Sequence, residues 1–435
     1  METAIGIILL LTFFAFIYYA AKGGNLLLGL FSMAVLWSGL GAIGGVIDWT
    51  TINTVVFQGG PEGFGPTAVN IIFGSWFGRI LIETGIARTI IRKAVELGGD
   101  KPALTCVLLC VVTTAIFTTA YGAGAVVAIG VIVFPIMLSL GISKHLATGS
   151  FAMSVGCGLY FNSALLTQAA GTMVIDDAKY NPLVPEWYRF AAIALAIHLL
   201  FVIVMVTLSV RKEKKVRTWT AGGADANLGQ ANANLWACLT PILPVTLAIA
   251  FRFSAIVSIV VAVVWALLWT KNFKSWKGVA NIVEKTFYDG VADVGLVLGF
   301  LLFLQMFIKA AGACKGLLAP IVSPILPANT FWLFVVFGAL GVLALFRGPM
   351  TIWGAGAATF AIVSSTGLYP LAVLFPLFYI PATTITTSVC PTQSWNLWAI
   401  GYNKVGVKEF LKQVLPYILP LCLILEIIAY FMFAA

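Results

Sequence analysis

Two apolar stretches of this chain are too long to cross a membrane once, and each is interrupted near its middle. They cover residues 103–140 and 330–366, whereas about 20 residues are enough for one crossing. The first is interrupted at Thr118–Ala125 (TTAYGAGA), and the second at Phe346–Pro349, which is followed by MTIWGAGA at Met350–Ala357. We therefore predict two re-entrant helical hairpins, because irregular backbone at membrane depth is tolerated only where protein or a water-filled cavity surrounds it.

The rest of the chain predicts a polytopic, all-α membrane protein. Hydrophobic residues make up 61% of its 435 residues and charged residues 9%, whereas about a quarter of a soluble protein is charged. This excludes a soluble domain, and basic cytoplasmic loops explain the net charge of +9 without a nucleic-acid partner. We expect about ten transmembrane helices, at roughly 4–20, 26–47, 66–87, 146–176, 187–209, 236–252, 254–271, 288–310, 369–397 and 414–434.

The Lys and Arg residues predict which way these helices point. If the densest basic cluster, residues 211–217, is cytoplasmic, counting crossings from it places 18 of the 25 basic side chains on the cytoplasmic side. The opposite orientation would reverse this bias, against the rule that cytoplasmic loops are rich in Lys and Arg. We therefore expect both termini to be extracytoplasmic and the protein to lie in the cell (inner) membrane.

An internal repeat connects the two hairpins. YGAGA at Tyr121 and WGAGA at Trp353 are 232 residues apart. Two further pairs of similar segments have the same order: Gly85–Arg88 with Gly312–Lys315 at 227 residues, and Asn162–Gln168 with Thr387–Gln393 at 225. Coincidence between segments of similar apolar composition is the alternative to a duplication.

A duplication would divide the chain into repeats at 1–210 and 236–435, joined by a cytoplasmic linker at 211–235. Each repeat holds five crossings, and because five is odd the two repeats are inverted in the membrane. One crossing of each, 146–176 and 369–397, has a polar centre and is predicted to be a broken helix. Inverted repeats with broken helices are typical of secondary transporters, whose site lies near the bilayer midplane.

This order of helices, hairpin and broken crossing resembles the ion transporter superfamily of organic-anion permeases. Within it, the stretch from Gly65-Pro66 to Gly85, followed by Arg88 and Arg92, is similar to gluconate permeases and citrate–metal symporters. The Ser-Asn-Thr triplets of the dicarboxylate branch are absent. The resemblance implies an elevator-type transport domain that moves against a dimeric scaffold, and hence a homodimer.

Arg347 is the strongest single indication of a binding site. It lies at the predicted tip of the second hairpin, where a charged side chain costs at least about 2.5–3.5 kcal/mol and therefore needs a partner. A substrate carboxylate or phosphate matches its planar guanidinium. The alternatives are a structural pair with a buried carboxylate such as Glu426, or a side chain that reaches the interface. The repeat equivalent is Ala115, so the two hairpins differ chemically.

The other substrate-binding candidates lie in the hairpin tips and broken crossings. Hydroxyl and amide groups there can bind substrate hydroxyls, freed carbonyls can coordinate a cation, and half-helix N-termini favour an anion. Close helix packing is the alternative role for small polar residues. The candidates are Thr118, Thr119, Tyr121, Gly122, Asn162, Ser163, Thr351, Trp353, Gly354, Thr387, Ser388, Thr392 and Gln393. Their aromatic rings, with Tyr160 and Trp395, either stack on a sugar-like substrate or pack.

Candidates for the coupling ion are few. Glu83 is either a buried proton carrier or the i, i+4 ion-pair partner of Arg79. Glu426 is a lone carboxylate in the last helix, with a packing role as the alternative. Thr167 and Gln168 complete the coupling-ion candidates. Asp289 and Asp293 are expected near the cytoplasmic start of a helix, where a favourable interaction with the helix dipole is enough to explain their charge.

The leading hypothesis is an ion-coupled symporter of a small organic anion, such as a sugar acid or hydroxycarboxylate, in the lipid bilayer. The first alternative is a cation/proton antiporter on the same architecture. The second is an integral-membrane enzyme or channel, although inverted hairpins suit alternating access better than a continuous pore. No catalytic motif, nucleotide-binding motif or metal-ligand cluster occurs, so we expect neither an enzyme nor a cofactor or metal. The coupling ion stays open: scarce carboxylates favour Na⁺, and the resemblance favours H⁺.

Overall fold

A computed structural model describes residues 2–22, 24–99, 101–173, 185–212, 233–270 and 275–434. These residues form helices, turns and irregular segments and no strand, which confirms the predicted all-helical class for this part of the chain. Together with the apolar composition, the helices make this a multi-pass membrane protein. The predicted linker at 211–235, with most of the basic cluster used for orientation, lies largely outside the described residues.

The first half of the chain contains a hairpin of two helices, α6 and α7, followed by a broken helix, α8 and α9. Its elements are α1 (Glu2–Ala21), α2 (Leu26–Ile43), the π-helix η1 (Thr51–Gln58), α3 (Gly59–Gly63), α4 (Gly65–Glu83), α5 (Ile86–Gly98), α6 (Pro102–Phe117), α7 (Ala123–Ser139), α8 (Lys144–Gly158), the 3₁₀ turn η2 (Leu159–Phe161), α9 (Ser163–Thr172) and α10 (Pro185–Lys212).

The second half has the same order, with a hairpin built from α16, η6 and α17 before the broken helix of α18, η7 and α19. Its elements are η3 (Leu235–Leu239), α12 (Leu243–Phe251), α13 (Ala255–Trp269), α14 (Trp276–Ala313), α15 (Lys315–Val322), η5 (Ser323–Ile325), α16 (Thr330–Ala339), η6 (Gly341–Arg347), α17 (Gly356–Ser365), α18 (Leu371–Pro381), the π-helix η7 (Ala382–Thr387), α19 (Ser394–Asn403) and α20 (Val407–Phe433).

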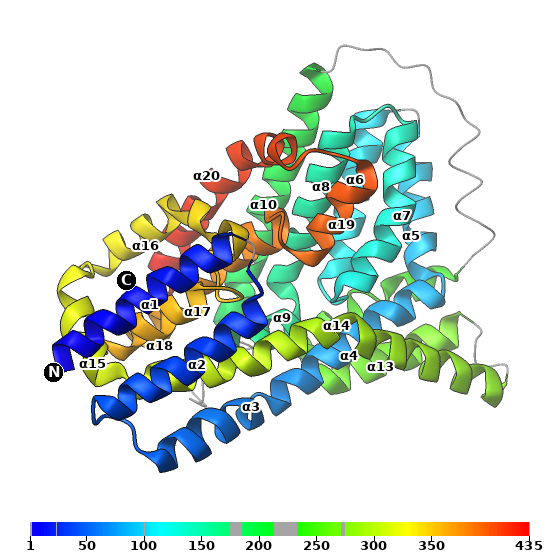
Figure 1. Ribbon diagram of the computed structural model, residues 1–435. Helices are drawn as coiled ribbons and strands as arrows, with labels where there is room; N and C mark the ends of the chain where they lie inside the picture. The colour runs from blue at the N-terminus through cyan, green and yellow to red at the C-terminus, as the bar shows by residue number, and fades with distance from the viewer. Residues whose placement is uncertain are drawn as a thin grey trace.

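Five described helices are each long and apolar enough to cross a membrane alone: α1, α2, α10, α14 and α20. The other predicted crossings are shorter or interrupted, and α15 with its 3₁₀ extension meets α16 at a bend of 89°. The count of ten crossings therefore stays a prediction. The N-terminal end of α1 and the C-terminal end of α20 both lie on the left of Figure 1.

The two broken helices resume at positions that bear on the predicted repeat. Helix α9 begins after Asn162 and α19 begins after Gln393, 231 residues on. This spacing is closer to the 232 residues between Tyr121 and Trp353 than to the 225 residues between Asn162 and Thr387, and the repeat itself stays a prediction. The first break is a 3₁₀ turn, whereas the second has a π-helix and six further residues, 388–393, before its second half begins.

Arg79 and Glu83, considered above as an ion pair, have other partners instead. Helix α14 packs along α4 and α2 in the lower part of Figure 1, so partners on a neighbouring helix are available. Arg79 donates from Nε and Nη2 to the two Asp293 carboxylate oxygens, each at 2.6 Å. Glu83 accepts from Lys285 Nζ at 2.7 Å. Asp293 lies in the middle of the 38-residue α14, and not near a helix start as expected.

Candidate substrate-binding site

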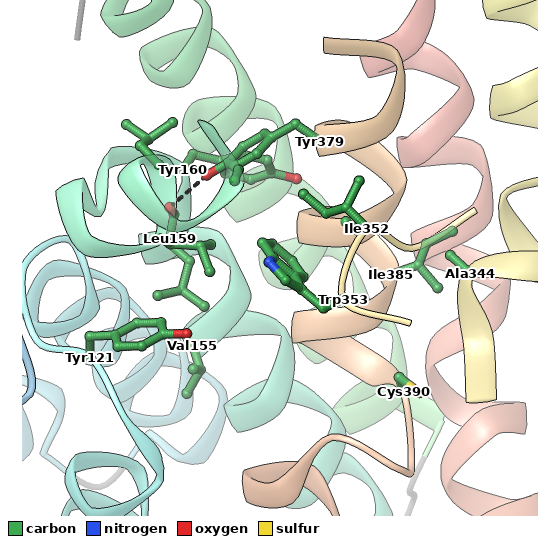
Figure 2. Packing of buried hydrophobic residues seen from close by; sticks show 14 of the residues in the cluster. Tyr121, Val155, Leu159, Tyr160, Ala344, Ile352, Trp353, Tyr379, Ile385 and Cys390 are labelled. Atoms are coloured by element: carbon green, nitrogen blue, oxygen red, sulfur yellow. Dashed lines mark hydrogen bonds between the residues drawn. The ribbon is translucent and has the colours of Figure 1, made fainter. Parts of the chain in front are cut away.

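The hairpin tips and the broken helices meet in the interior of the protein. Figure 2 shows Trp353 of the second tip between α8, which carries Val155, and the second broken helix, which carries Ile385 and Cys390. Tyr121 of the first tip lies on the same side as Val155. All five side chains are buried. The dashed line in Figure 2 joins the two broken helices, because the hydroxyl of Tyr379 on α18 donates to the Leu159 carbonyl at 3.3 Å.

The backbone of the second tip is held in an unfavourable conformation. Phe346 and Arg347 both have positive φ, 53° and 61°, which costs a non-glycine residue about 1–3 kcal/mol. Two hydrogen bonds close the tip, from Ala355 N to the Arg347 carbonyl at 2.8 Å and from Gly356 N to the Gly348 carbonyl at 3.1 Å. Gly354 is required, since a Cβ there would lie 2.4 Å from the Arg347 carbonyl oxygen.

The Arg347 side chain is only partly used by the protein. Its Nη1 donates to the Trp353 carbonyl at 3.0 Å, and its guanidinium interacts electrostatically with the Tyr121 hydroxyl and the Cys390 thiol. It forms no ion pair within the described residues, so the alternative pair with Glu426 is not formed. One of its five N–H donors has an acceptor in this part of the chain, and the others are available to an anion.

The second tip contains further unused donors. The Thr351 hydroxyl and the Trp353 indole N–H are buried without a hydrogen-bond partner among the residues that the structure describes. Each unsatisfied buried polar group costs about 1–3 kcal/mol. Such groups are rare in folded proteins and are explained by a missing water, ion or ligand. Donors beside an unpaired guanidinium suit a negatively charged, hydroxyl-bearing ligand.

The first tip, by contrast, donates its hydroxyl hydrogens within the protein. Thr118 donates to the Ala115 carbonyl at 2.7 Å, and Thr119 to the Pro241 carbonyl at 2.7 Å. The Tyr121 hydroxyl donates to Gln168 Oε1 at 2.5 Å. Gly122 has a φ of 104° where α7 begins, a conformation that side chains disfavour. This tip therefore offers acceptors and an aromatic ring, but its hydroxyls are not free donors.

Asn162 attaches the first tip to the first broken helix. Its Oδ1 accepts from Leu165 N at 3.1 Å and caps α9, while its Nδ2 donates to the Phe117 and Ala120 carbonyls at 3.2 and 2.9 Å. The adjacent Ser163 is partly buried, and its carbonyl accepts from Thr167 at 2.7 Å. Asn162 and Thr167 thus have structural bonds that account for their polar groups.

The second broken helix supplies polar groups at a wider break. Thr387 and Ser388 both donate to the Thr383 carbonyl, at 2.5 and 3.1 Å. Thr392 is exposed, and its hydroxyl lies 3.0 Å from Cys390 Sγ. Gln393 is buried at the start of α19 and does not cap it through its side chain.

Two residues of this break were not among the predicted site residues. Asn396 Nδ2 donates to the Thr387 and Cys390 carbonyls, at 3.2 and 3.1 Å. Cys390 Sγ accepts from Phe346 N at 3.1 Å and so connects the break to the second tip. The sequence could have indicated Asn396, because an amide side chain is unusual in an apolar helix. It could not have indicated Cys390, because a cysteine in an apolar run usually has only a packing role.

Of the coupling-ion candidates, only Glu426 keeps an unexplained carboxylate. Glu83 is exposed and pairs with Lys285, so the burial expected of a membrane proton carrier is not found there. Thr167 and Gln168 are hydrogen-bonded within the protein. Glu426 is fully buried, and neither of its oxygens has a partner in the described residues.

Comparison with known proteins identifies the fold and no family. Neither a scan against protein-family models nor a search of curated protein sequences finds a match. Among solved structures, the YdaH transporter of Alcanivorax borkumensis, whose crystal structure is described as having an unusual topology, aligns with a TM-score of 0.63 and 15% identity. The alignment covers 94% of this chain and 99% of YdaH. This chain therefore shares the fold of a membrane transporter over nearly its whole length.

Proposed function

We propose that this protein is an ion-coupled symporter of a small organic anion, such as a sugar acid or hydroxycarboxylate. The observation that carries the proposal is Arg347, a cation at the interior hairpin tip that has no carboxylate partner among the described residues. Arg347 is partly buried, and such a cation is stabilised when an anion pairs with it, which a bound substrate would supply. The fold shared with a transporter supports the general class.

The second tip recognises the substrate in this proposal. The Arg347 guanidinium binds the carboxylate through two parallel N–H donors. The Thr351 hydroxyl and the Trp353 indole donate to substrate hydroxyls, which satisfies both groups when substrate is bound. The Tyr121 ring, edge-on to Trp395 with their centroids 6.4 Å apart, forms the opposite wall.

Transport then requires that the site open to each side in turn. We propose that the hairpins and broken helices move together, as an elevator, against the helices that pack around α14, and that the protein works as a homodimer. H⁺ or Na⁺ supplies the driving force. Both termini would face the outside of the inner membrane. A single cysteine introduced at Lys408, in the first turn of α20, should then react only with a reagent applied from the cytoplasmic side.

A cation/proton antiporter is the second candidate function. The buried, unpartnered carboxylate of Glu426 favours it, because such exchangers need a titratable group inside the membrane. The unpaired Arg347 argues against it, since a cation at the tip repels the cation to be carried. Cation-driven proton flux in the absence of any organic acid would favour this candidate.

Uptake into proteoliposomes tests the symporter. Radiolabelled gluconate and citrate are the probes, each driven by a proton gradient and separately by a sodium gradient. We expect saturable accumulation of at least one acid by the wild type and its loss in Arg347→Gln. The control is Arg211→Gln, which removes an exposed arginine at the end of α10. No accumulation of either acid, or unchanged affinity in Arg347→Gln, would contradict the proposal.

A further inference from the structure

Glu426 is a buried carboxylate that the proposed binding site does not use. It lies on α20, seven residues or about 10 Å before the last helical residue, Phe433. Its exposed fraction is 0%, and both carboxyl oxygens lack a hydrogen-bond donor within the described residues. No described contact accounts for a carboxyl group at this buried position, so its role has to follow from the chemistry of the carboxyl group itself.

The elements packed against α20 supply no counter-charge within the part of the chain that the structure describes. Helix α16 has no titratable residue. The buried or partly buried titratable or charged groups of the other elements are Cys157 on α8, Tyr188 and His198 on α10, Tyr379 on α18, Arg347 at the end of η6, and Tyr417, Cys422 and Tyr430 on α20 itself, while His145 on α8 is exposed.

Each of these groups is engaged elsewhere or is not a cation. His145 lies 3.9 Å from Glu409, near the opposite end of α20. His198 Nδ1 lies 3.3 Å from the Tyr160 hydroxyl, and Arg347 donates to the Trp353 carbonyl. The Cys422 thiol, one helical turn away, is the group that interacts electrostatically with Glu426. Cys157 on α8 and Tyr379 on α18 donate to backbone carbonyls, and the other three tyrosines are not cations.

An ionised carboxylate without a cation or hydrogen-bond donors is strongly disfavoured in a low-dielectric interior. A group in such a site becomes neutral instead, which for a carboxylate means that it binds a proton. The arrangement seen here therefore fits the protonated form of Glu426. Deprotonation requires that water or a cation reach the carboxyl, and hence that the surrounding helices separate.

The helix that covers Glu426 is the first arm of the second hairpin. A Cβ built on Gly338 of α16 would lie 2.8 Å from the Leu423 Cα and 3.2 Å from the Glu426 Cβ, so the two helices touch at this point. The same arm continues through η6 to Arg347, nine residues after Gly338. Movement of the arm away from α20 would both shift Arg347 and uncover the carboxyl.

We propose that Glu426 is the proton-binding site of the transport cycle, protonated while α16 packs on α20 and deprotonated when they separate. The inference rests on the proposed symport and names H⁺ as the coupling ion. The carboxylate takes one proton from water on one side of the membrane and releases it to water on the other. Because α16 connects the two sites, binding of the acid at Arg347 and binding of the proton at Glu426 favour the same hairpin position.

Infrared spectroscopy of the protein in liposomes tests the protonation state without any substrate. We expect the wild type at neutral pH to show the C=O stretching band of a protonated carboxyl group, and Glu426→Gln to lose it. Glu409→Gln, which changes an exposed carboxylate on the same helix, should keep the band. A band of equal intensity in Glu426→Gln and the wild type, or no such band in the wild type, would overturn the proposal.

Transport separates this inference from the proposed function. With gluconate and citrate as probes, Glu426→Gln should exchange labelled for unlabelled acid as fast as the wild type, because exchange needs no net proton movement. Its accumulation driven by a proton gradient should fall at least tenfold, and Glu409→Gln should accumulate normally. Proton-driven accumulation that persists in Glu426→Gln overturns the inference alone. If the wild type carries neither acid, the proposed substrate class fails, and the infrared result still decides the role of Glu426.

Discussion

The two hairpin tips have similar sequences but offer a ligand different groups. The first tip donates its Thr118, Thr119 and Tyr121 hydroxyls to acceptors inside the protein, at 2.5–2.7 Å. The second leaves the Thr351 hydroxyl, the Trp353 indole and most of the Arg347 guanidinium without protein partners in the described residues. The two tips therefore differ in the hydrogen-bond donors that they leave free, which supports the proposal that the second tip binds the substrate.

The two tips also differ in backbone strain. The first tip places a glycine, Gly122, at its positive φ, where no strain results. The second places Phe346 and Arg347 there. Strain of this kind persists only where the surroundings enforce it, and it occurs mainly at functional sites. The costly backbone and the unused donors therefore occur together in the second tip.

The largest expected effect is on substrate affinity in Arg347→Gln. Loss of a charged, bidentate contact should raise the apparent KM about 100-fold, or about 2.7 kcal/mol. The matched change in the first tip, Thr118→Val, should alter KM by less than threefold, because that hydroxyl already donates to a backbone carbonyl. Concentration-dependent uptake in proteoliposomes measures both. Equal effects in the two tips would abolish the distinction between them.

Asn162→Ala should affect stability more than affinity. It removes the cap of α9 and two hydrogen bonds to the first tip, together about 2 kcal/mol. We expect a lower thermal unfolding temperature in detergent and, in the folded fraction, an apparent KM close to that of the wild type. A large KM increase at unchanged stability would mean that the first tip binds substrate directly.

Two tryptophan variants separate recognition from structure by removing only an indole N–H. Trp353→Phe removes a donor with no protein partner and should raise KM about fivefold, or about 1 kcal/mol. Trp395→Phe removes a donor to the Thr387 carbonyl at 2.8 Å and should lower stability by a similar amount instead. Uptake kinetics and thermal unfolding of both variants distinguish the effects. The opposite pattern would assign substrate contact to Trp395.

The smallest expected effect concerns backbone strain. Phe346→Gly relieves a positive φ of 53°, which offsets the lost contacts of a side chain that is 37% exposed. We expect the unfolding temperature to change by only a few degrees, in either direction. Gly122→Ala, with a φ of 104°, should lower it clearly. A larger loss in the Phe346 variant would show that its ring is needed to hold the tip.

Much of this architecture could be predicted because small and polar residues in apolar runs mark where helices break. Thr118–Ala125, Asn162 and the polar stretch after Thr383 all lie at observed interruptions of helices. The cross-helix partners could not be predicted in this way. Arg79 and Asp293 are 214 residues apart, and only the packing of α4 on α14 brings them together.

The candidate site was predictable in residue type but not in hydrogen bonding. Threonines in both tips look alike in sequence, yet only tertiary contacts decide whether a hydroxyl has an acceptor. Thr119, for example, donates to the carbonyl of Pro241, 122 residues away. The different lengths of the two breaks could not be predicted either, because the number of residues in a break depends on backbone geometry.

The bond from Phe346 N to Cys390 Sγ gives the protein a built-in chemical reporter. Sulfur is a weak acceptor, so the second tip is tethered less firmly at this point than the first tip is by Asn162. Cys390 is fully buried while that tether holds, and lifting of the tip would expose its thiol. In the proposed transport cycle, the rate at which a membrane-permeant alkylating reagent modifies Cys390 should measure how often the hairpin opens, and a bound substrate should slow the reaction.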